Sequence, residues 1–392
     1  MTDNPTNTVR RTPWPSSTSR PLVTPLQPSV VYTATDPDSL DAQYADGTGF
    51  TYAREGHPNA AVLAAKIDQL EGQAGGIITG SGMSAIGAVF LALLKAGDHV
   101  LGGDQLYGRS LRLMSEDLPR LGIETGLADP TDMVAMRAAV RPNTRMILIE
   151  VVSNPTIRVA DVAGIASLAK EIGALLVVDN TFTTPRGFQP FSHGADVVVH
   201  SVTKMLAGHS DATLGYAVAR DADLNERLAI TNASWGLTPS PFDCWLAERG
   251  MHSFALRYDQ SQRNAEALAA YLAGLSGVKR VLYPTRADHP DHNRAVSLLG
   301  TNGGHMLSFE IHGGRDAANT LTRAAPDLAF APTLGDIGTT LSHPPTSSHR
   351  ALSAQAREAM GISEGFFRVS VGVEPIDVLT QELGGAIEAA TS

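Results

Sequence analysis

The feature that most constrains the fold is a repeated alternation of short, almost continuous apolar segments with amphipathic helical segments. The apolar segments are 99–101, 146–152, 175–179, 197–201 and 214–219. Between the second and the third of them, a helical pattern begins at the capping residue Asp161 and stops before Gly173. Strands and helices in this alternation are typical of a parallel sheet that is covered by helices on both faces. We therefore predict an α/β fold with a mainly parallel sheet.

Two further helices are predicted upstream of these strands. The first has Asn59 as its candidate cap, carries apolar side chains at four-residue and three-residue spacing, and ends at Gly72. The second follows Ser81-Gly82-Met83-Ser84, and its expected terminator is Gly97.

The pattern changes at both ends of the chain. After the Pro-Ser-Pro sequence at 239–241 we expect a long helix over 254–275 and strands over 305–311 and 367–373, which indicates a smaller α+β domain. The first ~50 residues are rich in proline, serine and threonine and have little helical period, so we expect an extended arm. The predicted parts are an arm over 1–58, a large domain over 59–250 and a C-terminal domain over 251–392. The arm is either a disordered tail or a segment that lies across another subunit, and its apolar content after Val30 favours the second.

Charge and cysteine content exclude several functions. The 392 residues include 30 Lys and Arg against 40 Asp and Glu, and they contain no long basic block, so nucleic acid is not an expected partner. Cys244 is the only cysteine, which excludes an intrachain disulfide and a cysteine-based zinc site. The apolar runs fall short of the ~20 residues that cross a bilayer, and the N-terminal segment does not read as a signal peptide. We expect no membrane partner and a cytoplasmic location.

Polar residues stand where three of the predicted strands end. One strand ends at Glu150, the next at Asp179-Asn180-Thr181, and the next at His200-Ser201-Val202-Thr203-Lys204. The carboxyl ends of parallel strands meet at one edge of the sheet, where ligands of such folds bind. We therefore expect a carboxylate, a pair of hydroxyls and a lysine to converge there.

This set of groups suits pyridoxal 5'-phosphate (PLP). A buried lysine can lose its proton and form a Schiff base with an aldehyde. An aspartate that faces a pyridine nitrogen keeps it protonated and makes the ring an electron sink. The hydroxyls of Ser201 and Thr203 and the backbone N–H groups of Gly82 and Met83 suit a phosphate dianion. From the residues alone, two plainer interpretations stay open: the aspartate can be a turn cap, and the lysine can be a solvated side chain.

The motifs together resemble a known family. They are Tyr52-Ala53-Arg54, Ser81-Gly82-Met83-Ser84-Ala85, Tyr107-Gly108, Asn154-Pro155, Asp179-Asn180-Thr181, His200-Ser201-Val202-Thr203-Lys204, Gly208-His209-Ser210-Asp211, Tyr283-Pro284, Thr333-Leu334-Gly335, His343-Pro344 and Arg368-Val369-Ser370-Val371-Gly372-Val373-Glu374. In this order, over about residues 30 to 385, the sequence resembles the Cys/Met-metabolism PLP-dependent enzymes. This transsulfuration family includes cystathionine γ-synthase, cystathionine γ-lyase, cystathionine β-lyase, methionine γ-lyase and the homoserine sulfhydrylases. The resemblance implies the fold of the PLP-dependent transferases, which is like that of aspartate aminotransferase and is called fold type I.

The resemblance also implies roles for individual residues. Lys204 and Tyr107 are the expected catalytic residues: Lys204 binds the cofactor and moves protons, and Tyr107 stacks over the cofactor ring. The remaining expected cofactor contacts are Asp179, Ser201, Thr203, Gly82 and Met83, with Tyr52 and Arg54 reaching in from a neighbouring subunit. The expected substrate contacts are Arg368, which grips the α-carboxylate, Asn154 and Thr333. A homodimer is then the minimal active unit, and a homotetramer is the expected assembly. No metal is expected, since the histidines of the cluster at 288–292 have poor ligand spacing.

The sequence departs from the family pattern in the segments with which the family recognises the distal end of its substrate. Thr333 replaces a usual serine, Gly338 replaces a common glutamate, and residues 345–349 also differ. The expected function is a carbon–sulfur lyase that acts on cystathionine or a related thioether amino acid by β- or γ-elimination. The alternatives are γ-replacement, as in cystathionine γ-synthase or an O-acylhomoserine sulfhydrylase, and an aminotransferase on the same fold. A cofactor-binding regulator without activity is a third alternative.

Overall fold

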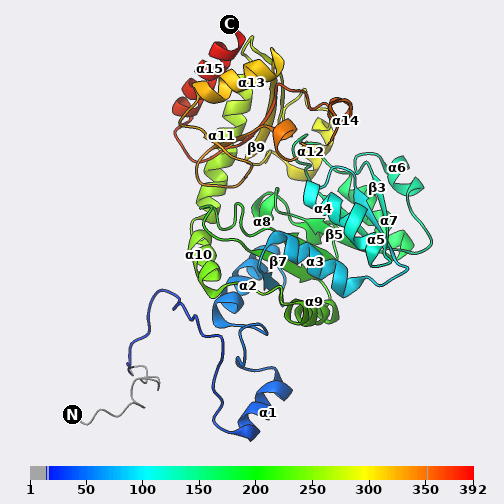
Figure 1. Cartoon of the computed structure of the whole chain (residues 1–392), viewed down its shortest axis with the longest axis vertical. Helices are drawn as coiled ribbons and strands as arrows, with labels where there is room; N and C mark the ends of the chain where they lie inside the picture. The colour runs from blue at the N-terminus through cyan, green and yellow to red at the C-terminus, as the bar shows by residue number, and fades with distance from the viewer. Residues whose placement is uncertain (1–14, 16, 351) are drawn as a thin grey trace.

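A computed structural model describes residues 15, 17–350 and 352–392 of the chain. Residues 1–14 and 16 of the predicted arm lie outside the described residues. The described part forms two sheets with their helices, and a protruding N-terminal segment (Figure 1). Within it, no helix combines the length and the apolar character needed to span a membrane.

The larger sheet carries the predicted strands. Its order is β1-β7-β6-β5-β4-β2-β3. The strands are β1 (Ile77–Thr79), β2 (His99–Gly103), β3 (Glu124–Ala128), β4 (Thr144–Glu150), β5 (Leu175–Asp179), β6 (Val197–His200) and β7 (Gly215–Ala219). Strands β3, β2, β4, β5 and β6 are parallel, and β7 is antiparallel to both of its neighbours, β6 and β1, which confirms the mainly parallel sheet. The sequence pattern missed β1, which is very short, and β3, which is an edge strand with exposed residues.

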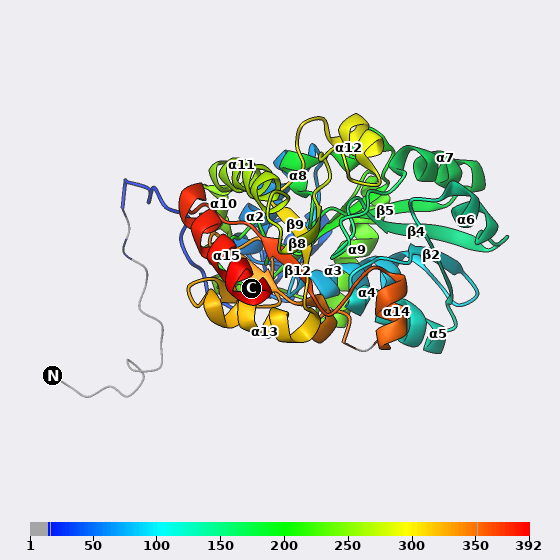
Figure 2. The same ribbon diagram turned by 90° about the horizontal axis from the view of Figure 1, so that it is seen from above.

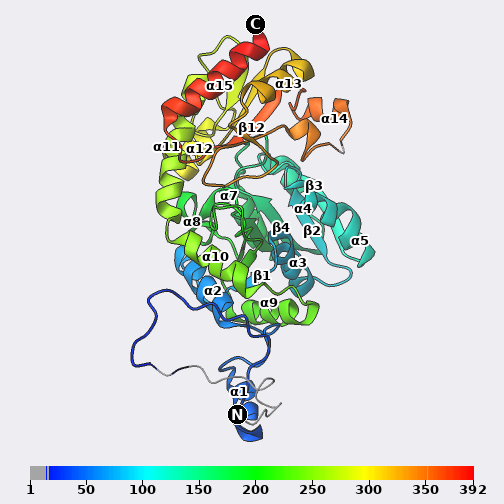
Figure 3. The same cartoon turned by 60° about the vertical axis from the view of Figure 1, so that its left-hand side comes forward.

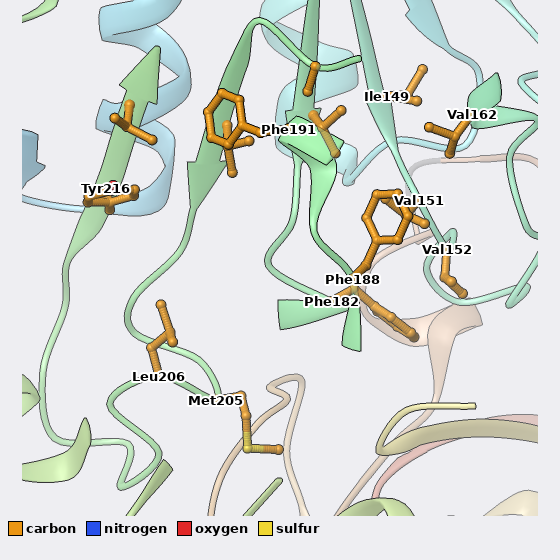
Figure 4. Close-up of a cluster of buried hydrophobic side chains, with 14 of the residues drawn as sticks. Ile149, Val151, Val152, Val162, Phe182, Phe188, Phe191, Met205, Leu206 and Tyr216 are labelled. Carbon is orange, nitrogen blue, oxygen red and sulfur yellow. The ribbon is translucent and has the colours of Figure 1, made fainter. Parts of the chain in front are cut away.

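Helices cover both faces of this sheet because its central strands are apolar on both sides. Ile147 and Ile149 of β4 pack into one core, and Met146 and Leu148 pack into the other. Helices of the first face are α2 (Pro58–Glu71), α6 (Met133–Ala138), α7 (Val162–Ile172), α8 (Thr184–Gly187) and α10 (Pro241–Met251). On the opposite face lie α3 (Gly82–Leu93), α5 (Leu118–Arg120) and α9 (Ala222–Trp235). Figure 2 shows α7 and α5 on opposite sides of the strands, and Figure 4 shows part of the first core around Phe182 and Phe188.

Two predicted helix ends are wrong. The cap of α2 is His57, whose side chain accepts a hydrogen bond from the N–H of Ala60, so Asn59 lies inside the first turn. Asn59 is instead buried, and it binds the arm through Pro25 O and the N–H of Gln27. Helix α3 ends at Leu93, several residues before Gly97. The expected end of α2 at Gly72 and the expected cap of α7 at Asp161 are confirmed.

The smaller sheet belongs to the C-terminal part of the chain. Its order is β10-β11-β12-β9-β8, from β8 (Val278–Leu282), β9 (Met306–Ile311), β10 (Ala329–Phe330), β11 (Thr340–Ser342) and β12 (Phe366–Ser370). The helices of this part are α11 (Phe254–Leu272), α12 (His292–Leu299), α13 (Gly314–Ala324), α14 (Ala354–Ala359) and α15 (Ile376–Thr391). Only β9 and β12 were predicted, since the other strands are short or half-exposed. Figure 1 shows α11 running from the larger unit into the smaller one.

An ion pair joins the two units and explains the cluster at 288–292. Asp291 accepts hydrogen bonds from Arg158 Nε at 2.6 Å and Nη2 at 3.0 Å, and from the N–H of Val159 at 3.0 Å. His289 Nδ1 accepts from the N–H of Asp291. The cluster therefore fastens the C-terminal unit to the loop after β4.

The arm is anchored to the body at residues 24–27 and then protrudes. Trp245 Nε1 donates to Thr24 O at 2.8 Å, beside the bonds from Asn59. Beyond this anchor, the chain runs out and back through a bridge between Val31 and Tyr52, with the helix α1 (Pro37–Asp46) at its tip (Figures 1 and 3). The sequence pattern missed α1. Apolar side chains on both sides of the anchor face solvent: Leu22 and Val23 before it and Val31 after it are 102%, 63% and 62% exposed.

Candidate active site

A cavity of about 250 Å³ lies at the carboxyl ends of β4, β5 and β6, under the loop 332–334 of the C-terminal unit. Its lining residues are Ser81, Gly82, Met83, Ile86, Tyr107, Glu150, Asn154, Asp179, Thr181, Phe182, Ser201, Thr203, Lys204, Thr213, Pro332, Thr333, Leu334 and Arg368. Every predicted site residue except Tyr52 and Arg54 is in this set. The structure therefore brings together residues that lie up to 287 positions apart, from Ser81 to Arg368.

Lys204 lies in the turn after β6 and points at the C-terminal unit. Its Nζ donates to Thr333 Oγ1 at 3.3 Å. Burial lowers the pKa of Lys204, and the positive charge of Arg368 lowers it further, so the amine loses its proton more readily than that of a solvated lysine. Arg257 of α11 holds the turn by donating to Met205 O at 2.8 Å and Leu206 O at 3.1 Å. A neutral amine on a fixed turn is the form of lysine that attacks an aldehyde.

Two carboxyl groups lie side by side at the strand ends, because Glu150 pairs with Asp179 in the register of β4 and β5. Burial raises the pKa of Asp179, while hydrogen bonds from Thr181 and the charge of His200 oppose that rise. Burial and the charge of Asp179 raise the pKa of Glu150 well above its usual range. Glu150 also accepts a hydrogen bond from the N–H of Tyr107 at 2.6 Å. Asp179 is therefore the better placed of the two to remain ionised.

The start of α3 forms a cradle with the loop after β6. A side chain at Gly82 would place its Cβ 2.7 Å from Ser201 Cβ and 3.0 Å from Ser201 Cα, so only glycine fits. Ser81 caps the helix by accepting from the N–H of Ser84, and this leaves the N–H groups of Gly82 and Met83 at the helix start. The N–H of Ser201 donates to Thr181 Oγ1 at 2.7 Å. Backbone donors and a hydroxyl at a helix N-terminus are a favourable site for a phosphate.

The hydroxyl of Thr203 is committed to the backbone. It donates to Leu214 O at 3.1 Å and accepts from the N–H of Leu214 at 2.9 Å. Thr203 lines the cavity as expected, but its hydroxyl proton is engaged in this pairing with the start of β7.

Arg368 of β12 approaches the cavity from the C-terminal unit. It is buried, and its Nη1 donates to Asn154 Oδ1 at 2.8 Å while its Nη2 donates to Thr333 O at 2.6 Å. Burial lowers the pKa of Arg368 to about 10. Among the described residues its Nε has no hydrogen-bond partner. A buried guanidinium with a free N–H in a cavity is suited to a carboxylate.

Tyr52 and Arg54 lie away from the cavity of their own chain. Arg54 Nη1 donates to Ala233 O at 3.2 Å, and its guanidinium lies over the ring of Tyr52. Both side chains are exposed at the base of the protruding arm. Gly338 also lies outside the lining of the cavity, and its N–H donates to Asp336 Oδ1.

Some residues of the cavity are not among the predicted site residues. The sequence marks Glu150 only as a strand end and Thr181 only as part of a motif. In the structure, each accepts a hydrogen bond from the backbone of another residue that lines the cavity. Their position directly at the ends of β4 and β5 is the signal that could have identified them. Phe182 and Thr213 carry no signal in the sequence, because each reaches the cavity through the path of its loop.

Comparisons with known proteins agree with this geometry. The model of the family "Cys/Met metabolism PLP-dependent enzyme" matches residues 5–388. The chain belongs to this family. It is 39% identical to the cystathionine beta-lyase of Bacillus subtilis over 86% of each chain, and 37% identical to the cystathionine gamma-lyase of the same organism over 87% of this chain and 89% of that one. A solved cystathionine gamma synthase of Xanthomonas oryzae pv. oryzae, in complex with cystathionine, superposes with a TM-score of 0.89 at 36% identity and covers 94% of this chain and 93% of its own.

The family assignment confirms the predicted fold type and identifies the chain as a PLP-dependent enzyme of sulfur amino acid metabolism with an amino-acid substrate. The residues of the cavity fit PLP. They offer a buried lysine of lowered pKa for the aldehyde, a buried carboxylate for the ring nitrogen, and at Gly82 a cradle that any larger side chain would fill.

Proposed function

We propose that the protein is a carbon–sulfur lyase that cleaves cystathionine or a related thioether amino acid by elimination. The observation that carries the proposal is the shared contact at Thr333. Lys204 Nζ binds its hydroxyl and Arg368 Nη2 binds its carbonyl, at 3.3 Å and 2.6 Å. If Arg368 holds the carboxylate of an amino-acid substrate, the α-carbon of that substrate lies next to Lys204, since the carboxylate carbon and the α-carbon are one bond apart. Lys204 is then in reach of the α-proton, whose removal begins an elimination.

The cavity supports an assignment of the residues that would hold PLP. Lys204 would bind the aldehyde, Asp179 would bind the ring nitrogen, and the N–H groups of Gly82 and Met83 would bind the phosphate together with Ser201. Bound PLP supplies the electron sink that stabilises the charge left at the α-carbon. Thr203 shapes the phosphate loop through its pairing with Leu214.

The chain's own groups then complete the elimination. Lys204 takes the α-proton and returns a proton to the departing sulfur, so that the carbon–sulfur bond breaks and a thiol leaves. Tyr107 would cover the ring of bound PLP, and Glu150 fixes the tyrosine by accepting a hydrogen bond from its backbone N–H. Arg368 and Asn154 hold the carboxylate throughout, and this keeps the α-proton directed at Lys204.

The product mixture from cystathionine tests the reaction. Cleavage at the β-carbon yields homocysteine, pyruvate and ammonia, and cleavage at the γ-carbon yields cysteine, 2-oxobutyrate and ammonia, each with uptake of one water. We expect thiol and oxo acid in equal amounts. Formation of cystathionine from an O-acylhomoserine and cysteine, without net cleavage, would instead assign γ-replacement. Conversion of PLP to its amine form without thiol release would assign an aminotransferase.

Lys204→Ala provides the control for the site. We expect this variant to lose thiol release and to lose the absorbance band near 420 nm that the family shows in the loaded enzyme. An unchanged band would mean that another lysine carries the cofactor and that the site proposed above is wrong.

We infer that the enzyme is active as a homodimer, which pairs further into a tetramer. Tyr52 and Arg54 do not reach the cavity of their own chain, and they lie on an arm whose apolar side chains face solvent. A second copy of the chain would cover that arm and receive Tyr52 and Arg54 at its phosphate. A cytoplasmic location remains part of this proposal.

A mixing experiment tests the shared site. Arg54→Ala and Lys204→Ala subunits are each expected to be inactive or nearly so as pure preparations. In a mixed dimer both lesions fall in one site and the other site is intact, so co-expression restores about a quarter of wild-type activity if subunits pair at random. No recovery, with mixed dimers shown by mass spectrometry, would place Arg54 in the function of its own chain.

A further inference from the structure

A buried carboxylate outside the cavity joins the two loops that carry the cofactor contacts. Glu71, the last residue of α2, has a side chain that is 0% exposed. Its Oε1 accepts from Asn180 Nδ2 at 3.0 Å and contacts His200 Nε2 at 2.5 Å. Asn180 directly follows Asp179, and His200 directly precedes Ser201. One oxygen atom therefore binds both the residue after the ring-nitrogen contact and the residue before the phosphate contact.

The second carboxylate oxygen of Glu71 lowers the stability of the folded chain. Among the described residues, Glu71 Oε2 is buried without a hydrogen-bond partner. An unsatisfied buried carboxylate oxygen destabilises a fold, so its presence calls for a compensating role. An apolar side chain at this position would leave the buried Nε2 of His200 without this acceptor.

The network around Glu71 is closed on the cavity side. The N–H of Thr181 donates to Asp179 Oδ1 at 3.0 Å, and Thr181 Oγ1 accepts from the N–H of Ser201 at 2.7 Å. Thr183 Oγ1 donates to Asn180 Oδ1, which fixes the amide of Asn180 so that its Nδ2 faces Glu71. The ends of β5 and β6 are thus tied by Thr181 in front and by Glu71 behind.

We propose that Glu71 is a positioning residue for the PLP site, which sets the distance between the ring-nitrogen carboxylate of Asp179 and the phosphate donors at Ser201. PLP is rigid between its ring nitrogen and its phosphate-bearing carbon, so the two contacts must be held at a matching spacing for both to form.

The test is the affinity of the apoenzyme for PLP in Glu71→Gln. Glutamine keeps the volume and one acceptor but removes the charge that holds His200. We expect the dissociation constant of PLP to rise about tenfold, which is the loss of one charge-assisted hydrogen bond. The matched control is Glu310→Gln. Glu310 is also a buried glutamate, but it pairs with Lys279 and Arg280 on the far sheet, and we expect no change of PLP affinity there.

A structural role and a positioning role predict different readouts. If Glu71 only stabilises the fold, Glu71→Gln lowers the melting temperature of the apoenzyme and leaves PLP affinity within twofold of wild type, which overturns the proposal. If Glu71 positions the loops, the PLP affinity and the absorbance maximum of bound PLP change. In enzyme saturated with PLP, the KM of the amino-acid substrate stays near wild type, because Arg368 lies on the other unit. If Glu71→Gln does not fold, Glu71→Asp, which keeps the charge and shortens the reach, is expected to show the same loss of affinity.

The proposal rests on Asp179 and Ser201 being the cofactor contacts, and Ser201→Ala separates the two failures. Unchanged PLP affinity in Ser201→Ala would overturn the site itself. Weaker binding in Ser201→Ala with wild-type binding in Glu71→Gln would leave the site intact and overturn the role of Glu71.

Discussion

Arg368→Lys is the substitution that tests the substrate site most directly. Lysine keeps the positive charge of the buried guanidinium, so the electrostatics of the cavity are largely preserved. It loses the planar fork that now reaches Asn154 Oδ1 at 2.8 Å and Thr333 O at 2.6 Å and leaves Nε free for a substrate.

The expected effect follows from the number of bonds that lysine cannot make. A single ammonium cannot hold Thr333, Asn154 and a carboxylate in the arginine geometry, so at least one charge-assisted bond to the substrate is lost. Such a bond contributes about 1.5–3 kcal/mol. We therefore expect kcat/KM for cystathionine to fall about 10- to 100-fold, with most of the loss in KM.

The assay is steady-state release of thiol from cystathionine at saturating PLP. Bound PLP should keep its wild-type absorbance and affinity, because no cofactor contact is assigned to Arg368. Arg315→Lys, on an exposed ion pair of the same unit, is the matched control and should behave as wild type. A kcat/KM within twofold of wild type in Arg368→Lys would refute the assignment of Arg368 as the carboxylate contact.

Three further predictions concern the cradle, a buried histidine and the contact between units. In Gly82→Ala, the new Cβ would meet Ser201 at 2.7 Å and push the start of α3 away, so PLP affinity should fall at least tenfold in a fluorescence titration; an unchanged affinity would show that the phosphate binds elsewhere. Burial lowers the pKa of His305 to about 3, so between pH 6.5 and 3 the unfolded chain binds a proton that the folded chain does not. Stability should therefore fall as the pH drops below 6.5, by up to ~1.4 kcal/mol per pH unit, and denaturant unfolding of His305→Leu at pH 7 and pH 5 should show a smaller loss; equal losses would contradict the low pKa. Asp291→Asn breaks the two-pronged pair with Arg158 and should cost about 2 kcal/mol in urea unfolding, whereas a midpoint equal to wild type would mean that the pair does not hold the two units together.

The sequence alone predicted those features of the fold that depend on a few adjacent residues. A strand that is apolar on both faces must lie inside a sheet covered on both sides, and the residue that ends it must lie at the sheet's edge. The strand ends alone therefore predict that Asp179, Ser201 and Lys204 share one rim of the sheet, and the cavity confirms that they meet there. The family motifs added Arg368 and Asn154, which no local pattern could have joined.

Local patterns were less reliable at helix ends and on the arm. Asn59 was the expected cap, but His57 takes this position, and the side chain of Asn59 binds the backbone of the arm instead. The helix α1 was missed because its ten residues carry no buried face within the chain, so the pattern that signals an amphipathic helix is absent.

Only the tertiary structure decided which distant residues support the site. Glu71 lies at the end of a helix, His200 at the end of a strand 129 positions later, and neither has a neighbour in sequence that signals their pairing. Likewise the contact of Lys204 and Arg368 with Thr333 depends on how the C-terminal unit is seated over the sheet. The physical reason is that periodicity and strand ends depend on a few adjacent residues, whereas a hydrogen bond between separate elements exists only once packing has fixed their distance and direction.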